Sequence, residues 1–375
     1  MIVKRLVTFG FRNLDDFVFE PGKLVNILYG SNAQGKTNLL EALWLFTGSR
    51  SFRGSKDAEL LKFGTEKGQL ILDYETVARA QQIKLTLTSI RSAQQNGIAL
   101  DSPLKLSGEF CAVIFSPEHL GLVKEGPQLR RKFIDSAICQ LMPRYIFSVL
   151  EYKKILTHRN ALLKDIPFHA SLLETLDIWD EKLSVIGAHI IFTRMRYLKK
   201  LSEKASLIYA GISKNSETLL LSYSNHENFN YFCDLDHREE ALKALTSSLF
   251  SAMKKMRETD LACGYTHAGP HRDDLQISIS GISARTFGSQ GQQRTAVLSL
   301  KLAEAAVLWD TTGEPPVLLL DDVMSELDSS RQDYLLNNID GMQVFITCCD
   351  PTFQGALKNG SVFEVKNGSV RLNEL

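Results

Sequence analysis

The sequence predicts an α/β protein in which a sheet domain is built from both ends of the chain and a helical region is inserted between them. Apolar residues recur at helical spacing from about residue 128 to residue 212, with few glycines. A glycine-rich loop at residues 30–37 stands between a predicted strand and a predicted helix, as in nucleotide-binding α/β sheets. Strand-like runs lie near both ends of the chain, at residues 1–9, 24–29, 317–321 and 343–347.

Each remaining element follows from its own pattern. Leucines at helical spacing predict a helix over residues 36–47, and alternating apolar residues predict antiparallel strands within residues 69–90. The predicted helices are too short and irregular for a long coiled coil. Two more helices and one more strand are predicted at residues 238–257, 291–309 and 275–279.

Composition leaves nucleic-acid binding open. The 375 residues carry 43 basic and 43 acidic side chains, so the net charge is zero, and 44% of the residues are apolar. Neutrality argues against a uniformly basic nucleic-acid-binding domain. Residues 124–204, however, carry 15 basic and 9 acidic residues, whereas residues 310–375 carry 4 and 11. Residues 1–63, with 9 and 6, are also net basic.

Cysteine usage predicts a reducing compartment. The six cysteines form no C-x-x-C pair, and the only close pair is Cys348-Cys349. The first ten residues lack the apolar core of a signal peptide, and no run of 18 apolar residues predicts a membrane span. We therefore expect a cytoplasmic protein without a membrane partner.

Residues 30–37 carry the strongest chemical signal. Gly30-Ser31-Asn32-Ala33-Gln34-Gly35-Lys36-Thr37 satisfies the pattern G-x-x-x-x-G-K-[ST]. Glycines allow a tight turn whose backbone N–H groups face phosphate oxygens, and the following helix adds positive charge at its N-terminus. The lysine reaches the β- and γ-phosphates, and the threonine hydroxyl can bind Mg²⁺. We predict an ATP site here.

A second candidate segment is the apolar run Val317–Leu320, which ends in Asp321 and Asp322. Carboxylates at the carboxyl end of a buried parallel strand lie where such sheets bind ligands. Asp321 is expected to hold Mg²⁺, and Asp322 to orient or deprotonate the attacking water. Lys36, Asp321 and Asp322 are thus the predicted catalytic residues.

The segment Ser289-Gln290-Gly291-Gln292-Gln293-Arg294 allows two interpretations. A serine and backbone N–H groups at a helix start can form a second anion site, which would make sense if it completed the ATP pocket of a partner subunit. Serine is also a favoured residue for capping a helix that binds nothing. The residues alone do not decide between them.

The order phosphate loop, S-Q-G-Q-Q-R, L-L-L-D-D and S-E-L-D (residues 325–328) resembles the ATP-binding-cassette heads of SMC-type DNA repair ATPases, and especially the RecF family. Further matching stretches include residues 11–14 (FRNL), 129–135 (LRRKFID), 159–163 (RNALL) and 269–275 (GPHRDDL). Of these, the RRKFID and GPHRDDL segments are more specific to that family than the phosphate loop.

This resemblance implies a fold and a domain division. The fold would be an ABC-type ATPase head whose sheet lobe is built from both chain ends, with an inserted helical lobe and no long coiled coil. Residues 1–125 and 310–375 would form the ATPase lobe, with the Walker A, Walker B and D-loop motifs. Residues 126–309 would form the helical lobe with the signature motif.

The resemblance also implies a function. Two subunits would clamp DNA, single-stranded or duplex, at gap junctions, with two ATP molecules between them. Weak, DNA-stimulated ATP hydrolysis would release the clamp, and RecR and RecO would help to load RecA. Arg12, Asn38, Ser289, Gln290, Gly291 and Gln292 would join residues 30–37 in binding ATP.

Metal and DNA residues are carried over in the same way. Mg²⁺ would be bound by Thr37 and Asp321, with Glu118 as the nearest candidate for a third ligand. Asp322 replaces the usual catalytic glutamate, and Thr347 stands where a histidine is usual, so the resemblance implies slow hydrolysis. The candidate DNA contacts are Arg53, Arg130, Arg131 and Lys132.

Several features have simpler explanations. The basic runs at residues 124–132, 194–204 and 254–257 could be solvated helix faces, and Phe133 and Tyr197 are expected in the core. The pair His267 and His271 is broken by Gly269-Pro270, which disfavours a zinc site. Arg272 is a candidate phosphate or intersubunit contact.

The sequence disfavours two other classes of protein. A transporter ATPase predicts an L-S-G-G-Q segment and a switch histidine, and this sequence has neither at the matching positions. A chromosome-organising head without a repair function predicts long heptad arms, which the sequence lacks.

Overall fold

A computed structural model describes residues 1–224, 237–349 and 360–373. The chain divides into two compact units. The first comprises Met1–Leu120, Leu207–Glu217 and Gln290–Leu375, and the second comprises Gly121–Ser206 and Thr218–Ser289.

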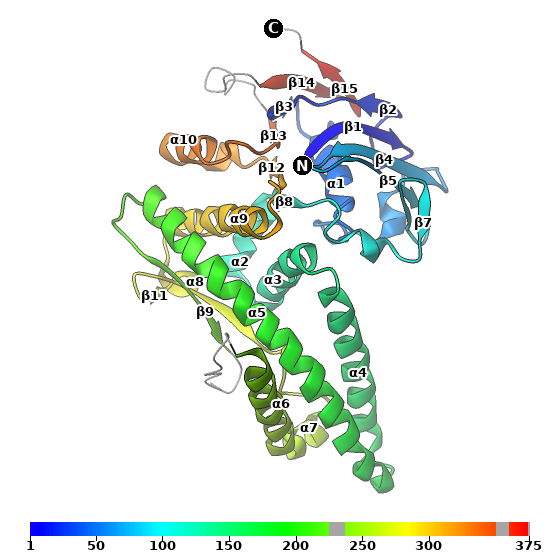
Figure 1. Ribbon diagram of the computed structural model, residues 1–375, viewed down its shortest axis with the longest axis vertical. Helices are drawn as coiled ribbons and strands as arrows, with labels where there is room; N and C mark the ends of the chain where they lie inside the picture. Colours follow the sequence, from blue (N-terminus) through cyan, green and yellow to red (C-terminus); the bar gives the residue numbers. More distant parts are fainter. Residues whose placement is uncertain (225–236, 350–359, 374–375) are drawn as a thin grey trace. The chain divides into compact units, whose positions relative to one another are not determined.

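The first unit contains a six-stranded, mostly parallel sheet made from both ends of the chain, with blue and orange-red strands side by side in Figure 1. Its central strands are apolar because both faces are covered: every residue of β12 and β13 is buried. Only β15 runs antiparallel to its neighbour. In spatial order the strands are β15 (Ser369–Leu372), β14 (Ser361–Lys366), β3 (Val25–Tyr29), β13 (Val344–Cys348), β12 (Val317–Asp321) and β8 (Ala112–Phe115).

A second, antiparallel sheet of six strands also belongs to the first unit. Burial alternates along β4 and β5, so one face packs on the core and the other meets solvent. In spatial order the strands are β2 (Phe17–Phe19), β1 (Ile2–Phe9), β4 (Gly68–Glu75), β5 (Ala80–Leu87), β6 (Ser92–Gln95) and β7 (Ile98–Leu100). The helices of this unit are α1 (Lys36–Leu45), α9 (Gln290–Thr312), α10 (Ser329–Asn337) and the 3₁₀ turns η1 (Asp57–Leu60), η2 (Pro103–Leu106), η3 (Pro117–Leu120) and η5 (Met324–Glu326).

The second unit is mainly helical and includes a three-stranded antiparallel sheet. Its helices are α2 (Gly121–Lys124), α3 (Pro127–Leu141), α4 (Tyr145–Asp165), η4 (Ala170–Thr175), α5 (Leu176–Ile212), α6 (Arg238–Lys255), α7 (Arg257–Cys263) and α8 (Ala284–Phe287). Its strands are β9 (Leu219–Ser224), β10 (Asp274–Ile279) and β11 (Ile282–Ser283). The last residues of α5, from Leu207, belong to the first unit.

Ion pairs of buried arginines link α3 to β10 and to α5 within the second unit. Arg130 on α3 makes two bonds to the Asp274 carboxylate, of 2.7 and 2.8 Å, and Arg131 donates to the Asp273 carbonyl at 2.7 Å. Asp135 on the same helix pairs with Arg194 of α5, which also donates to the Pro270 carbonyl. The stretches at 129–135 and 269–275 therefore hold each other in place.

The stretch at residues 159–163 has a similar role. Arg159 is fully buried and pairs with Asp180 and Asp260, at 2.7 Å each. Its neighbour Asn160 accepts hydrogen bonds from the N–H and the hydroxyl of Thr266. Charged groups can be buried in this way only because each is paired with an opposite charge.

The structure differs from the predicted domain boundaries. Helix α9 falls in the first unit, because nearly all of its residues from Gln293 to Leu308 are buried and it packs against β8 and η3. The first boundary falls after Leu120 rather than after residue 125. The assignment of separate functional roles to the two lobes remains a prediction.

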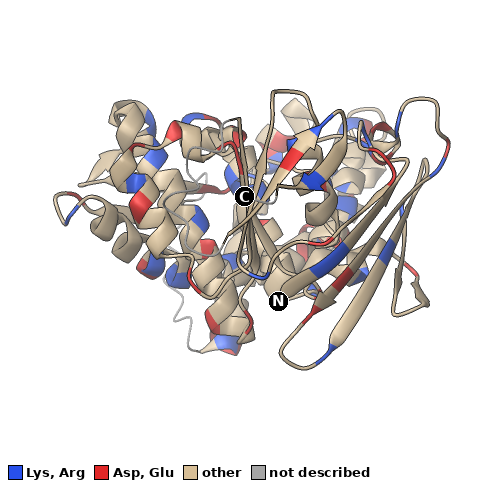
Figure 2. Cartoon of the chain, turned by 90° about the horizontal axis from the view of Figure 1, so that it is seen from above, with Lys and Arg blue, Asp and Glu red and all other residues tan. Residues whose placement is uncertain are grey.

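Basic and acidic residues are interspersed over both units (Figure 2). No helix in the described part of the chain is long and apolar enough to span a membrane. The five cysteines outside the undescribed segments, which include Cys233, are free thiols. The cytoplasmic location stays a prediction.

Candidate functional site

The glycine-rich loop directly follows β3 and ends at the first turn of α1. Gly30 and Gly35 have φ angles of 152° and 112°, which favour glycine. The Lys36 ammonium donates to the carbonyls of Gly30 (2.5 Å) and Ser31 (2.9 Å). It thus lies over the loop, where an incoming phosphate would compete with these carbonyls for it.

Thr37 and Asp321 lie side by side, as the sequence predicted. The Thr37 hydroxyl donates to Asp321 Oδ1 at 2.8 Å, and the Thr347 hydroxyl donates to the same oxygen at 2.8 Å. Burial raises the pKa of Asp321. The hydrogen bonds from the two threonine hydroxyls lower this pKa, and the nearby carboxylates of Glu118 and Asp322 raise it. A hydroxyl and a carboxylate meeting at the carboxyl end of β12 are a donor set that suits Mg²⁺.

The predicted third ligand, Glu118, is exposed in η3, and its negative charge helps to raise the pKa of Asp321. Its role as a ligand stays a prediction. Nowhere in residues 1–224, 237–349 and 360–373 do three or more His, Cys, Asp or Glu side chains gather as a metal site would require. A Mg²⁺ held by one carboxylate, one hydroxyl and phosphate oxygens needs no such group.

Asp322 is held in an unusual conformation. Its φ angle is +52°, its N–H donates to the Thr347 hydroxyl at 2.9 Å, and its Oδ1 accepts from the Ser325 hydroxyl at 3.0 Å. Thr347 therefore bridges Asp321 and Asp322, using its hydroxyl as donor to one and acceptor from the other. The sequence identified Thr347 only as a replacement for histidine, and this bridge could not be foreseen.

The guanidinium of Arg12 is hydrogen-bonded to other residues of the same chain. Its guanidinium makes bonds of 2.8 and 3.0 Å to the Glu41 carboxylate, and it also donates to the Ser55 hydroxyl and the Glu59 carbonyl. Glu41 is fully buried on α1 and also accepts from Ser51. Arg12 therefore anchors the loop around residues 51–59 to α1, and direct contact with ATP stays a prediction.

A polar chain runs beside the loop. Arg53 donates to Asn38 (3.0 Å), Asn38 donates to Asn13 (2.6 Å), and Asn13 donates to the Ala33 carbonyl (3.0 Å). Arg53 is exposed, and this chain of hydrogen bonds connects it to the phosphate loop. Sequence reasoning missed Asn13, although it stands next to Arg12 in the stretch FRNL.

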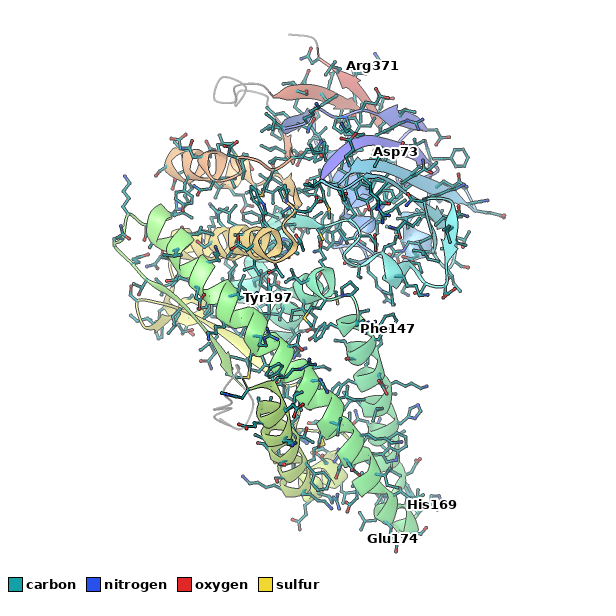
Figure 3. All side chains as sticks on the ribbon, viewed as in Figure 1. Asp73, Phe147, His169, Glu174, Tyr197 and Arg371 are labelled. Atoms are coloured by element: carbon teal, nitrogen blue, oxygen red, sulfur yellow. The ribbon has the colours of Figure 1, made fainter. Side chains whose placement is uncertain are left out.

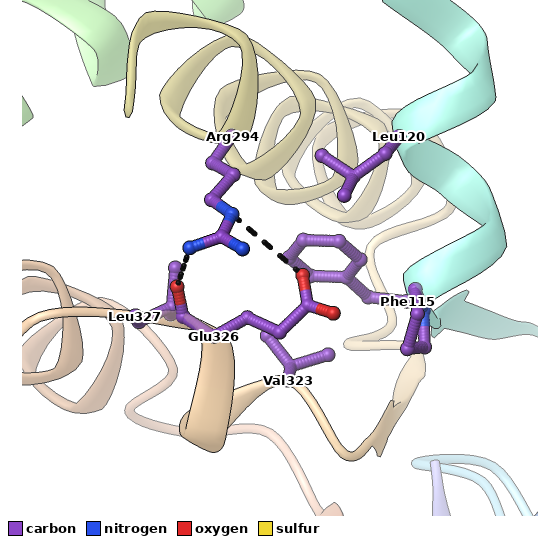
Figure 4. A pocket seen from close by; sticks show the side chains of 7 residues that line it. Phe115, Leu120, Arg294, Val323, Glu326 and Leu327 are labelled. Atoms are coloured by element: carbon purple, nitrogen blue, oxygen red, sulfur yellow. Dashed lines mark hydrogen bonds and ion pairs between the residues drawn. The ribbon is translucent and has the colours of Figure 1, made fainter. Parts of the chain in front are cut away.

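The segment predicted as a second anion site lies at the start of α9. Ser289 is exposed and immediately precedes the helix, and Gln292 donates to Glu217 at 2.6 Å. Arg294 donates to the carbonyl of Glu326 in the S-E-L-D segment at 3.0 Å (Figure 4). Around this pair lies a small pocket lined by Phe115, Pro117, Leu120, Val323 and Leu327. The start of α9 is thus bonded to the segment that follows Asp322.

The structure corrects part of the predicted DNA surface. Arg130 is 4% exposed and is bonded to Asp274 and to the carbonyls of Leu122 and Glu125, so it is unavailable to phosphate. Arg131 is half-buried and bonded to the Asp273 carbonyl, while Lys132 is exposed. Of residues 130–132, Lys132 is the exposed cation.

The basic runs are similarly mixed. Arg194 is buried with Asp135, and Lys254 and Arg257 pair with Asp177. Tyr197, labelled in Figure 3, and Phe133 are buried, as expected for core residues. The exposed cations of these runs are Lys124, Lys132, Arg196, Lys199, Lys200 and Lys255.

His267 and His271 have separate partners. His267 Nδ1 lies 2.7 Å from Asp260, and His271 lies between the Tyr152 hydroxyl (2.8 Å) and the Thr266 carbonyl (3.0 Å). Arg272 lies over the Tyr265 ring and donates to the Thr266 carbonyl. A role for Arg272 in contacting phosphate or a partner stays a prediction.

A family model described as "RecF/RecN/SMC N terminal domain" matches residues 2–371. The DNA replication and repair protein RecF of Clostridium acetobutylicum is 40% identical over 374 residues, covering 99% of both chains. The protein of the same name from Acetivibrio thermocellus is 40% identical over 352 residues, covering 93% of this chain and 94% of that one. The chain belongs to the RecF family.

Solved structures agree with this RecF-family membership. A structure titled "recombination mediator protein RecF-ATP in RecFOR pathway" superimposes with a TM-score of 0.90 and 38% identity, covering 99% of this chain and 97% of that one. The Smc head domain of Pyrococcus furiosus, bound to part of ScpA, has a TM-score of 0.55, 14% identity and coverage of 99% and 96%. The latter likeness concerns the fold alone. The predicted ABC-type ATPase head without a long coiled coil is thereby confirmed.

Proposed function

We propose that this RecF-family protein is an ATP-dependent DNA-binding protein of recombinational repair, in which ATP joins two copies into a clamp and slow hydrolysis releases it. The main support is the arrangement of Lys36, Thr37, Asp321 and Thr347 around the glycine-rich loop. The relatives named as DNA replication and repair proteins support the pathway. The similar structure whose title names ATP supports the nucleotide.

ATP binding would rearrange contacts that already exist. Lys36 would leave the Gly30 and Ser31 carbonyls for the β- and γ-phosphates. The hydrogen bond between Thr37 and Asp321 would open so that both oxygens face Mg²⁺, which neutralises phosphate charge. Burial disfavours the charge of Asp321 until this cation arrives.

Slow turnover follows from the contacts of the candidate base. Asp322 is one methylene shorter than glutamate, and one of its carboxylate oxygens already accepts from Ser325. Thr347 cannot act as a general base as histidine can, and its hydroxyl is engaged with Asp321 and Asp322. We therefore expect ATP to act mainly by holding the dimer together, with weak hydrolysis that DNA stimulates.

The composite site would use Ser289, Gln290, Gly291 and Gln292 of one copy against the ATP of the other. Support comes from the exposure of Ser289 directly before the long helix α9. The bond between Arg294 and the Glu326 carbonyl would link that segment to the one after Asp322. A change at either segment would then be felt at both ATP sites.

DNA would be bound through phosphates by exposed cations, with Lys132 and Arg53 first among those predicted. We propose that the substrate is DNA at single-strand gaps, both single-stranded and duplex. By family resemblance, RecR and RecO would be partners in loading RecA, in the cytoplasm.

ATP binding by a Lys36→Ala variant tests this function. Without the ammonium, the β- and γ-phosphates lose their main charge partner, so ATP affinity measured by calorimetry should fall below detection. The control is Lys23→Ala, which removes an exposed lysine that lies outside the glycine-rich loop. ATP binding by Lys36→Ala at wild-type strength would refute the proposed function.

A further inference from the structure

The C-terminal hairpin of β14 and β15 packs directly on the glycine-rich loop. Its two-residue turn, Asn367-Gly368, has φ angles of 51° and 83°, the left-handed values of a tight hairpin turn. The Asn367 N–H donates to the Gln34 side-chain oxygen at 2.6 Å, and the Gly368 N–H donates to the Gln34 carbonyl at 3.0 Å. Both N–H groups of the turn are therefore used to hold one residue of the loop.

The same turn is tied to the segment after β1. The Asp15 N–H donates to the Gly368 carbonyl at 3.0 Å, and the Ser369 hydroxyl donates to the Asp15 carboxylate at 2.8 Å. Asn13, two residues earlier, donates to the Ala33 carbonyl. The hairpin, the segment at 13–15 and the loop thus form a closed ring of hydrogen bonds.

Two glycines are required where the hairpin approaches closely. A Cβ on Gly30 would lie 2.2 Å from the Val365 carbonyl oxygen, and one on Gly368 would lie 2.1 Å from the Asn13 carbonyl oxygen. Both neighbours are backbone atoms that cannot turn aside. The hairpin therefore touches the loop at its first residue and, through Gln34 and Asn13, at its middle.

We propose that the Asn367-Gly368 turn is a positioning element for the nucleotide: it fixes the backbone of residues 33–35 so that their N–H groups face the phosphates. This inference rests on the proposed function, because it assumes that ATP binds in the loop. Preorganised donors bind without a cost of ordering, so a loosened loop should bind ATP more weakly.

The chain supplies a matched control in the β6–β7 hairpin. Its turn, Asn96-Gly97, has the same two residues and nearly the same φ angles, 49° and 81°. A Cβ on Gly97 would meet nothing within 4 Å. Gly97→Ala and Gly368→Ala therefore impose similar backbone strain through φ, but only the second also pushes on Asn13, whose side chain donates to the glycine-rich loop.

The experiment compares these two variants in the full-length protein. We expect Gly368→Ala to raise the dissociation constant of MgATP by about tenfold or more, and Gly97→Ala to leave it unchanged. The melting temperature without nucleotide should fall further for Gly368→Ala, whose Cβ meets backbone atoms of Asn13, so binding is measured well below the melting temperatures of both variants. MgATP binding by Gly368→Ala as tight as by Gly97→Ala would overturn the inference.

A second variant covers the case in which Gly368→Ala does not fold. Gln34→Ala removes the acceptor of the Asn367 N–H without adding an atom, and it should also weaken MgATP binding. Unchanged binding by Gln34→Ala would then overturn the inference. Failure of the proposed function itself would look different, because wild type and Lys36→Ala would bind MgATP alike.

Discussion

Arg130 and Lys132 stand two positions apart on α3 and have opposite environments. Arg130 is buried against Asp274, whereas Lys132 is exposed. Sequence alone placed both on a DNA surface, because a run of basic residues does not reveal which side chain has a carboxylate partner 144 residues away. Burial and pairing separate a structural arginine from a candidate DNA contact.

Substitution of these two residues should have separable effects. Arg130→Ala leaves Asp274 without its partner and should lower the free energy of unfolding by about 2 kcal/mol or more, as a drop in melting temperature would report. Lys132→Ala should change stability by less than about 0.5 kcal/mol. In DNA binding it should reduce the slope of log affinity against log salt by about one. An unchanged salt slope would remove Lys132 from the DNA surface.

At the scale of elements, the sequence predicted the buried parallel strands and the helix after the phosphate loop well. Strands β3, β12 and β13 and helix α1 agree with prediction to within a few residues, because continuous apolar runs and leucines at helical spacing are strong signals. Strands β14 and β15 were missed, although Asn367-Gly368 is a turn signal. Both strands are short: β14 has three buried apolar residues and β15 has none, so neither gives a long apolar run.

The candidate site was predictable in identity but not in connection. Residues 30–37, Asp321 and Asp322 follow from spacing alone. Other features of the site depend on residues up to 354 positions apart. They are the bridge made by Thr347, the pairing of Arg12 with Glu41 and the contacts of the C-terminal hairpin. Long-range contacts of single polar atoms leave no periodic trace in a sequence.

The segment at 269–275 contains two buried groups whose effects on stability oppose each other. Burial lowers the pKa of His271 from 6.5 to about 4. The contribution of neutral His271 to the free energy of unfolding is therefore lost as the pH falls from 6.5 towards 4. Burial raises the pKa of Asp273 from 3.8 to about 6, so its contribution is present below 3.8 and lost as pH rises through 6. Between about pH 4 and 6 the pH dependences of these two contributions to stability nearly cancel.

Asp273→Asn should expose this cancellation. The amide can still accept from the Tyr223 hydroxyl, which lies 2.5 Å from the carboxylate, but it does not titrate. The melting temperature of the variant, relative to wild type, should therefore rise between pH 4 and pH 6, by an amount equivalent to roughly 2–3 kcal/mol. A difference that stays constant over this range would contradict the assigned environment of Asp273.

At the scale of the whole molecule, the net charge of zero conceals opposed regions. In the acidic segment 310–375, Asp321 is bonded to threonines and Asp328 pairs with Arg331. In the basic segment 124–204, Arg130, Arg159 and Arg194 are buried with carboxylates. Much of the formal charge is thus paired within the protein. Long-range attraction to DNA should therefore be modest, and ATP-driven assembly should matter more for DNA binding.

Sedimentation of a Ser289→Arg variant with and without ATP shows whether two copies of the chain share ATP. The added arginine should block the partner's γ-phosphate site, while the variant's own glycine-rich loop stays intact. The control is Ser251→Arg, at an exposed serine on α6. We predict that Ser289→Arg binds ATP normally yet remains monomeric, whereas wild type and Ser251→Arg form ATP-dependent dimers. Normal ATP-dependent dimerisation of Ser289→Arg would contradict it.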